Sequence, residues 1–362
     1  MTSDFVLITG GAGFIGCRVG ARLSESAVRV VAVDALHPQV HRAPGRPRDL
    51  HDDVELVLAD SADAAGWDRF FLQFGIPTAI IHLAAETGTG QSLRESTRHA
   101  TANVVGTTAM LDALVRHGEL PAHVVLSSSR AVYGEGAWLG ADGALVYPKQ
   151  RGIKALLARE WDPTDGSGRP LQRLAHRASA IEPRPTNVYA ATKLAQEHIL
   201  RTWCSAFSVD LSVLRLQNVF GPGQAIGNAY TGVLTFFARA ACDGEALNVF
   251  EDGHILRDFV FVDDVVSAMC AALAQRPAAG LRTLDIGSGA PVELLPVARS
   301  IAAIAGSTEP YVSGDYRLGD VRAAAADVTD AFAELQWSPT TSLEDGLRRL
   351  VEWVGVEMAT RG

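Results

Sequence analysis

The sequence predicts an α/β fold, a doubly wound parallel sheet of the Rossmann type with helices on both faces. Two observations predict it. Short, continuously apolar runs alternate with amphipathic helical patterns through residues 1–217, and a glycine-rich turn follows the first apolar run. From residue 218 onward the apolar runs are shorter, so residues 218–362 are expected to form mainly a smaller second lobe.

The first strand–helix–strand unit holds the glycine-rich turn. Gly10 permits a tight turn, Gly13 lets the backbone approach a pyrophosphate, and Gly16 lets the helix pack on the strand. The free N–H groups at the start of this helix would face the phosphates. A second strand, residues 28–33, ends at Asp34. The unit therefore predicts a dinucleotide site.

The acid at the end of the second strand selects the cofactor. The Asp34 carboxylate can accept a hydrogen bond from a ribose 2′-hydroxyl and would repel a 2′-phosphate, which favours NAD over NADP. The polar loop that follows contains Arg42, Arg46 and Arg48, which could bind the 2′-phosphate of NADP. NADP is therefore the alternative cofactor.

Further cofactor contacts are expected where later strands end. Asp60 and Ser61 follow a strand over residues 54–59 and could contact adenine or cap a helix over residues 62–74. A strand over residues 78–83 ends in small residues that would let the cofactor lie against the backbone. The expected cofactor-binding residues are Gly10, Gly13, Phe14, Ile15, Gly16, Asp34, Asp60, Ser61, Leu83, Ala84, Ala85, Asn103, Ser127, Tyr189 and Lys193.

The catalytic candidates lie on a helix that begins near Tyr189. Tyr189 and Lys193 are four residues apart, which places them on one helical face. A nearby ammonium stabilises a phenolate, and lowering a tyrosine pKa of about 10 by roughly 3 units corresponds to about 4 kcal/mol. Ser129 follows a strand over residues 124–126 and could hydrogen-bond the same substrate oxygen. Ser128 is the alternative partner.

These residues resemble the extended short-chain dehydrogenase/reductase family of nucleotide-sugar epimerases and dehydratases. The resemblance covers nearly the whole chain. Besides the glycine turn and the Tyr189–Lys193 pair, it includes His-Leu-Ala-Ala at 82–85, Ser-Ser-Ser-x-x-Val-Tyr-Gly at 127–134, Arg-Leu-x-Asn-Val-Phe-Gly-Pro at 215–222 and Glu-Asp-Gly-x-x-x-Arg-Asp-Phe-Val at 251–260. It implies a nucleotide-diphosphate sugar, dTDP- or UDP-linked, as substrate. The substrate-binding residues that it implies are Thr87, Ser129, Arg130, Asn218, Val249, Arg257, Arg317 and Asp320.

The resemblance also separates possible reactions. The family's 4,6-dehydratases carry Asp-Glu directly after the position of Ser129, where this chain has Arg130 and Ala131, and neither residue can act as a carboxyl acid or base. The 4-epimerases need only Tyr, Lys and Ser. Within the family, residues 220–234 and the insertion over about 134–186 resemble the dTDP-L-rhamnose 4-epimerases. A 4-epimerase is therefore expected; the alternatives are a net 4-ketoreductase, a 4,6-dehydratase and a dinucleotide sensor without catalysis.

The composition limits the partners and the cellular compartment that we expect. The net charge of −9 argues against nucleic acid, no apolar stretch reaches the length of a membrane helix, and the four cysteines are scattered singly. A cytoplasmic protein without a metal site is expected. Residues 1–217 are expected to bind NAD, with a segment over about 262–287 returning to that domain. By the family resemblance, helices over residues 97–117 and 189–206 could form a homodimer interface.

Overall fold

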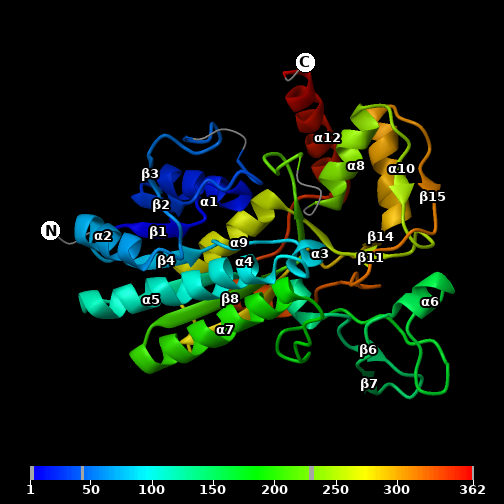
Figure 1. Cartoon of the computed structure of the whole chain (residues 1–362), viewed down its shortest axis with the longest axis horizontal. Coiled ribbons are helices and arrows are strands. Elements are labelled where there is room, and N and C mark those ends of the chain that lie inside the picture. Colours follow the sequence, from blue (N-terminus) through cyan, green and yellow to red (C-terminus); the bar gives the residue numbers. More distant parts are fainter. Residues whose placement is uncertain (1–3, 42–44, 228–231, 361–362) are drawn as a thin grey trace.

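The computed structural model describes residues 4–41, 45–227 and 232–360. Its centre is a seven-stranded sheet in the order β13-β8-β5-β4-β1-β2-β3, and every pair of neighbouring strands is parallel (Figure 1). The predicted Rossmann-type architecture is confirmed. From β1 the chain adds β2 and β3 on one side, and then β4 and the later strands on the other side. Open α/β sheets bind ligands where this order reverses, here between β1 and β4.

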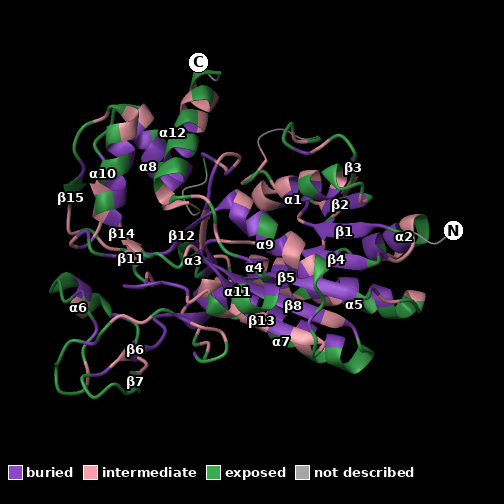
Figure 2. Ribbon diagram, turned by 180° about the vertical axis from the view of Figure 1, so that it is seen from behind, coloured by how far each residue is buried: buried purple, intermediate pink, exposed green. Residues whose placement is uncertain are grey.

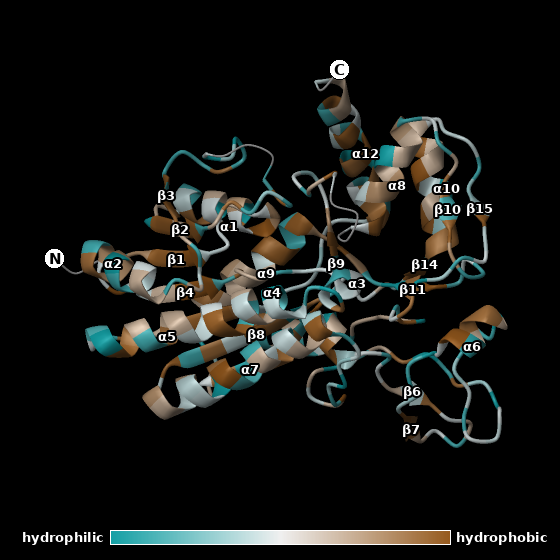
Figure 3. Cartoon of the chain, viewed as in Figure 1, coloured by the Kyte–Doolittle hydropathy of each residue, from teal (hydrophilic) through white to brown (hydrophobic). Residues whose placement is uncertain are grey.

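The strands of this sheet are apolar because both faces are covered by helices. All four residues of β1 are buried, and Figure 3 draws β1 and β2 as strongly hydrophobic. The strands are β1 (Val6–Thr9), β2 (Val30–Asp34), β3 (Val54–Leu58), β4 (Ala79–His82), β5 (His123–Ser129), β8 (Asp210–Leu216) and β13 (Leu281–Ile286). The last strand, β13, lies beyond residue 217 in the chain and pairs with β8.

Two hydrophobic layers lie on the two faces of the sheet, because alternate residues of a strand point to opposite sides. Ile8 belongs to one layer, with α1 (Phe14–Glu25) and α9 (Val262–Ala274). Leu7 belongs to the other, with α2 (Ala64–Phe74), α5 (Gly106–His117) and α7 (Val188–Phe207). Figure 2 shows mostly buried strands between helices that combine buried and exposed residues.

Some predicted boundaries differ from the structure. The helix expected over residues 97–117 consists of α4 (Ser96–Ala100), a π-helical turn over Thr101–Val105 and α5, and Asn103 lies in the π turn. The strand expected to end at Leu126 continues as β5 to Ser129, because the serine backbones pair with β8. One short helix, α3 (Thr89–Ser92), lies between β4 and α4 and was not predicted.

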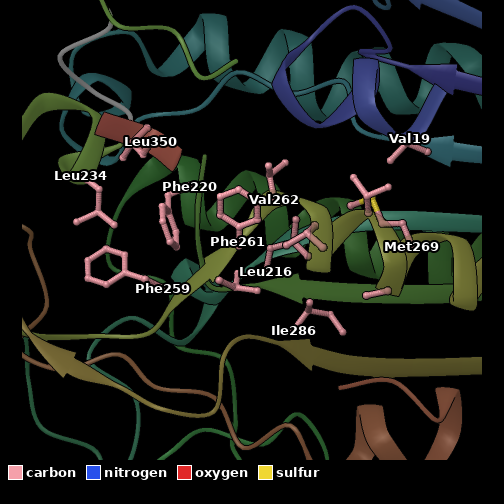
Figure 4. Close-up of a cluster of buried hydrophobic side chains, with 14 of the residues drawn as sticks. Val19, Leu216, Phe220, Leu234, Phe259, Phe261, Val262, Met269, Ile286 and Leu350 are labelled. Atoms are coloured by element: carbon pink, nitrogen blue, oxygen red, sulfur yellow. The ribbon is translucent and has the colours of Figure 1, made fainter. Parts of the chain in front are cut away.

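In the C-terminal lobe, α8 (Val233–Cys242), α10 (Leu294–Ala305) and α12 (Leu343–Ala359) pack together and continue the hydrophobic layer of α1 and α9. Figure 4 shows this continuity, with Val19 and Met269 at one end and Leu234 and Leu350 at the other. The elements of the lobe are β9 (Asn218–Phe220), α8 (Val233–Cys242), β10 (Asn248–Val249), β11 (Leu256–Arg257), β12 (Phe259–Phe261), β14 (Val292–Glu293), α10 (Leu294–Ala305), β15 (Tyr311–Val312), α11 (Thr329–Leu335) and α12 (Leu343–Ala359).

The insertion contains β6 (Trp138–Leu139), β7 (Leu145–Val146) and α6 (Ile153–Leu157). It is attached to the C-terminal lobe by buried charges. Arg151 Nη1 donates to both carboxylate oxygens of Glu251 at 2.8 Å, and Arg322 Nη1 donates to Glu251 Oε2 at 3.0 Å. Across the described residues, no helix is long and apolar enough to cross a membrane.

Candidate active site

The glycine turn follows β1 and touches the end of β4, at the point where the strand order reverses. Gly10 has a φ of +68°, which favours glycine, and a Cβ there would lie 2.8 Å from the backbone nitrogen of Ala84. A Cβ on Gly16 would lie 2.5 Å from the carbonyl oxygen of Gly10. Gly13 is the N-cap of α1 and makes no side-chain cap bond, so the first-turn N–H groups are available to phosphates.

Asp34 ends β2 with its carboxylate held against this turn. Asp34 Oδ2 accepts from the Ala12 amide at 3.1 Å, and Oδ1 accepts from the Leu36 amide at 2.8 Å. Of the arginines that could have served a 2′-phosphate, Arg46 donates to the carbonyl oxygen of Val54, and Arg48 pairs with Glu357. Arg42 lies outside the described residues. The turn and carboxylate therefore fit NAD.

Asp60 and Ser61 follow β3 but do not cap the next helix. The N-cap of α2 is Asp63, so the capping role considered for the earlier pair is wrong. Asp60 Oδ1 instead accepts from the Ala62 amide at 2.9 Å, in a local turn. Ser61 Oγ lies where a Cβ on Gly106 would meet it, at 2.6 Å.

Asn103 and Ser127 are buried and bonded within the protein. Asn103 Oδ1 accepts from the Glu86 amide at 2.7 Å, and its Nδ2 donates to Thr192 Oγ1 at 2.9 Å. This amide thus joins the loop after β4, which carries Leu83, Ala84, Ala85 and Thr87, to helix α7. Ser127 Oγ donates to the carbonyl oxygen of His82 at 3.4 Å.

The phenol of Tyr189 lies in the first turn of α7, next to the end of β5. The Asn187 side chain caps this helix by accepting from the Ala190 amide at 2.9 Å. Ser129 lies next to the Tyr189 hydroxyl and lowers its pKa against the larger effect of burial, and Ser129 Oγ accepts from the Ala131 amide at 3.1 Å. Ser128 points elsewhere and donates to Glu197. Of the two serines that the sequence left open, the structure brings Ser129 to the tyrosine.

Burial raises the pKa of Tyr189, while Ser129 and the charge of Arg130 lower it. Lys193 is 2% exposed, and burial lowers the pKa of its ammonium to about 7, partly offset by Glu197. Its Nζ donates to Gln196 Oε1 at 2.6 Å. Within the described residues, no hydrogen bond joins Lys193 to Tyr189. The sequence argument named the pair but missed Gln196, which its position three residues after Lys193 could have indicated.

Besides Ser129, the expected substrate-binding residue Arg130 lies near the phenol, and Arg257 and Asp320 lie near Arg130. Arg257 Nη2 donates to Asp320 Oδ1 at 2.6 Å. Arg130 is half-buried; burial and the charge of Arg257 lower its pKa to about 10, whereas Asp320 and Tyr189 act in the opposite direction. In the described part of the chain, no hydrogen bond or ion pair occupies the Arg130 guanidinium. A ligand oxygen could therefore bind it.

The remaining expected substrate contacts are less closely grouped. Asn218 opens β9, and its Oδ1 is buried without a hydrogen-bond partner in the described structure. The Arg317 guanidinium lies 5.6 Å from the centre of the Phe250 ring, and Val249 is fully buried in β10. Val249 therefore offers a ligand no side-chain surface in this arrangement. No interaction links the Arg317 and Arg257 guanidinium groups within the described part of the chain.

Comparison with known proteins identifies the class. The profile of the "NAD dependent epimerase/dehydratase family" matches residues 6–150 and 164–287, and the chain belongs to that family. It is 52% identical over 353 residues to a dTDP-L-rhamnose 4-epimerase from Burkholderia thailandensis, covering 98% of this chain and 95% of the relative. It is 30% identical to a UDP-glucose 4-epimerase from Mycolicibacterium smegmatis, covering 96% of this chain and 97% of the relative.

Solved structures agree with this class. A UDP-glucose 4-epimerase from Thermotoga maritima with UDP-glucose superposes with a TM-score of 0.77 at 27% identity, covering 98% of this chain and 99% of the other. The Thermus thermophilus UDP-glucose 4-epimerase in complex with NAD gives 0.75 at 26% identity, covering 96% and 98%. The predicted class, an NAD-dependent nucleotide-sugar 4-epimerase, is confirmed.

Proposed function

We propose that this protein interconverts the C4 epimers of a dTDP-linked 6-deoxyhexose, with dTDP-L-rhamnose as the first substrate to test and UDP-linked sugars as the alternative. The observation that supports this most is the 52% identity to a dTDP-L-rhamnose 4-epimerase over nearly the full length of both chains. The half-buried Arg130 beside the phenol provides a cation for substrate oxygens in either case.

The residues for NAD lie around the glycine turn. In this proposal the free amides after Gly13 hold the pyrophosphate, and Asp34 accepts from the ribose hydroxyls. Lys193 and the strand-end residues at 83–85 line the nicotinamide half. When bound, NAD supplies a ring that takes the C4 hydride of the sugar and later returns it.

The protein's part in the reaction is proton transfer and orientation. The Tyr189 phenolate takes the proton of the sugar 4-hydroxyl, and Ser129 donates a hydrogen bond to the oxygen that becomes the transient 4-ketone. The Lys193 ammonium stabilises the phenolate. Asn218, Arg257 and Arg317 hold the diphosphate while the keto sugar turns, so that the opposite face can be reduced.

The proposal also divides the chain by task. Residues 1–217, together with about 262–287, form the NAD-binding domain, and residues 218–362 mainly hold the nucleotide sugar. In support, β13 joins the central sheet from beyond residue 217, and the insertion at 134–186 packs against the C-terminal lobe through Arg151 and Glu251.

An isotope experiment tests the reaction. The purified holoenzyme, without added cofactor, is incubated with dTDP-L-rhamnose deuterated at C4, and UDP-glucose and UDP-glucuronate serve as parallel substrates. The proposal expects a mixture of C4 epimers that retains the deuterium, with no NADH consumed. A single turnover to the 4-keto sugar, with the C4 deuteride left on the bound cofactor and one NAD+ reduced per ketone formed, would instead establish a net oxidoreductase. Turnover of the UDP sugars alone would overturn the dTDP assignment.

We also propose a cytoplasmic homodimer. Apolar side chains are exposed on the helices that cover one face of the sheet: Val105 (47%), Val115 (44%) and Phe207 (43%). A second copy of the chain packed on this face would bury them. Sedimentation equilibrium of the wild type and of Phe207→Glu tests this; a monomeric wild type contradicts it.

A further inference from the structure

A buried polar cluster lies directly behind Lys193. We name it the lysine network; its members are Thr9, His82, Thr107, Lys193 and Gln196. They come from β1, β4, α5 and α7, and each is at most 2% exposed. Buried polar groups of this kind require hydrogen-bond partners, so the pattern of donors and acceptors can be worked out.

The hydroxyl of Thr107 sets the direction of the Gln196 amide. Thr107 Oγ1 donates to the carbonyl oxygen of Asn103 at 2.6 Å. Its lone pairs are then free to accept, and Gln196 Nε2 donates to Thr107 Oγ1 at 2.9 Å. The carbonyl end of the amide consequently faces the other way, where Gln196 Oε1 accepts from Lys193 Nζ.

The ring of His82 supports the same direction. His82 Nε2 lies 2.9 Å from Thr107 Oγ1 and 3.2 Å from Gln196 Nε2. A proton on Nε2 would point to Thr107 Oγ1 and leave the second amide hydrogen of Gln196 without an acceptor, whereas an unprotonated Nε2 accepts that hydrogen. We assign the ring proton to Nδ1, which lies 2.7 Å from Thr9 Oγ1, because this tautomer gives both amide hydrogens of Gln196 an acceptor. A ring protonated on both nitrogens would set an N–H against the amide N–H and favour a flipped amide, whose NH₂ would face the ammonium.

His82 is neutral in this environment. Burial, followed by the nearby charge of Lys193, lowers the pKa of His82 to about 3. The titratable groups that interact with the Lys193 ammonium are His82 from β4 and Glu197 on α7 itself, and Tyr189 lies one turn earlier on the same helix. Glu197 is bonded to Arg215 at 2.8 Å, so no carboxylate is hydrogen-bonded to the ammonium in the described structure.

We propose that Gln196 and His82 are positioning residues for Lys193. The neutral histidine orients the amide, and the amide carbonyl holds the ammonium in place without cancelling its charge. A carboxylate at the same position would form an ion pair and weaken the effect of the ammonium on Tyr189. This inference rests on the proposed role of Lys193 in 4-epimerisation.

The test measures the pH profile of kcat for the holoenzyme with dTDP-L-rhamnose. Gln196→Met and His82→Leu remove the two polar contacts, and both are expected to move the acidic limb of the profile upward by about one pH unit. That shift lowers kcat about tenfold below the limb. KM is expected to change little, because neither residue contacts the sugar. His82→Gln, which restores an acceptor near the position of Nε2, is expected to recover most of the wild-type profile.

His123 provides a matched control. It is another buried histidine, 3% exposed on β5, and its ring bonds to Ser212 at 2.9 Å, outside the lysine network. His123→Leu is expected to reduce stability but keep the wild-type pH profile. A wild-type profile for both Gln196→Met and His82→Leu, or the same shift in His123→Leu, would overturn the positioning role. Inactivity of the wild type on every nucleotide sugar would overturn the proposed function instead.

Discussion

Two neighbouring residues of α7, Gln196 and Glu197, belong to buried polar networks of opposite character. Gln196 belongs to the lysine network, in which the single cation is held by a neutral amide. Glu197 belongs to a second cluster, which we name the arginine network: Ser128, Tyr133, Glu197, Arg215 and Asp285. In this cluster the Arg215 guanidinium donates to both carboxylate oxygens of Glu197, at 3.0 and 2.8 Å.

The arginine network extends from Arg215 to Tyr133 and Asp285. Arg215 Nη1 donates to the Tyr133 hydroxyl at 3.0 Å, and that hydroxyl donates to both oxygens of Asp285 at 2.9 Å. Burial opposes the charge of Arg215, but its bonds to Glu197 and Tyr133 outweigh burial and raise its pKa. Burial has the opposite outcome for Lys193, whose pKa falls to about 7.

The comparison shows that one helix, α7, can carry both a network that stabilises the fold and a network that supports the proposed reaction. A buried charge with a bonded counter-charge is stable in place and resists change. A buried ammonium that has only neutral hydrogen-bond partners retains most of its field, and it can act on a phenol or a ligand. Four predictions test this contrast, from the largest expected effect to the smallest.

The first prediction concerns catalysis. Lys193→Met should lower kcat by about 10³-fold or more, because the phenolate of Tyr189 loses its ammonium. The far-ultraviolet circular dichroism spectrum should match that of the wild type. Steady-state kinetics measures the effect, and turnover within tenfold of wild type would contradict the catalytic role of this lysine.

The second prediction concerns stability. Arg215→Met should lower the free energy of unfolding by about 3–5 kcal/mol, because Glu197 would be left buried without a counter-charge. Denaturant titration measures it. Arg348→Met is the control, since it removes an exposed pair with Glu344 on α12 and should cost at most about 0.5 kcal/mol. Equal losses in the two variants would show that the arginine network contributes nothing beyond a surface pair.

The third prediction is a pH dependence, measured on protein freed of cofactor. The unfolded chain binds a proton at Lys193 up to a pKa of about 10.4, whereas the folded state releases it near 7. The unfolded state therefore binds more protons between these values, and stability rises with pH there. Lys193→Met should be more stable than wild type by about 2–4 kcal/mol below pH 7, and this advantage should vanish above pH 10. A pH-independent difference would refute the assignment.

The fourth prediction concerns the support that the two networks share. Asn187→Ala removes the cap of α7 and should reduce the free energy of unfolding by about 1 kcal/mol. Asn187→Ser, which keeps a capping oxygen, should recover most of that loss in the same thermal or denaturant assay. Equal free energies of unfolding for Asn187→Ala and Asn187→Ser would show that the Asn187 cap does not stabilise α7.

The sequence argument worked best where local geometry decides the outcome. The glycine turn, the acid at the end of β2 and the four-residue spacing of Tyr189 and Lys193 depend on residues close together in the chain, and each was readable without coordinates. The capping role considered for Asp60 and Ser61 failed because α2 begins two residues later than expected, at Ala64, which places Asp63 at the N-cap position.

By itself, then, the sequence determined the class of fold, the preference for NAD and the candidate tyrosine–lysine pair, because backbone conformation and helical periodicity are set by neighbours in the chain. Only the tertiary structure decided that Ser129 rather than Ser128 meets Tyr189, and that the insertion is attached to the lobe through Arg151. The partners of Gln196 were also decided there, since His82 is 114 residues away in the chain. Such contacts depend on how separate elements pack, and no local pattern encodes that packing.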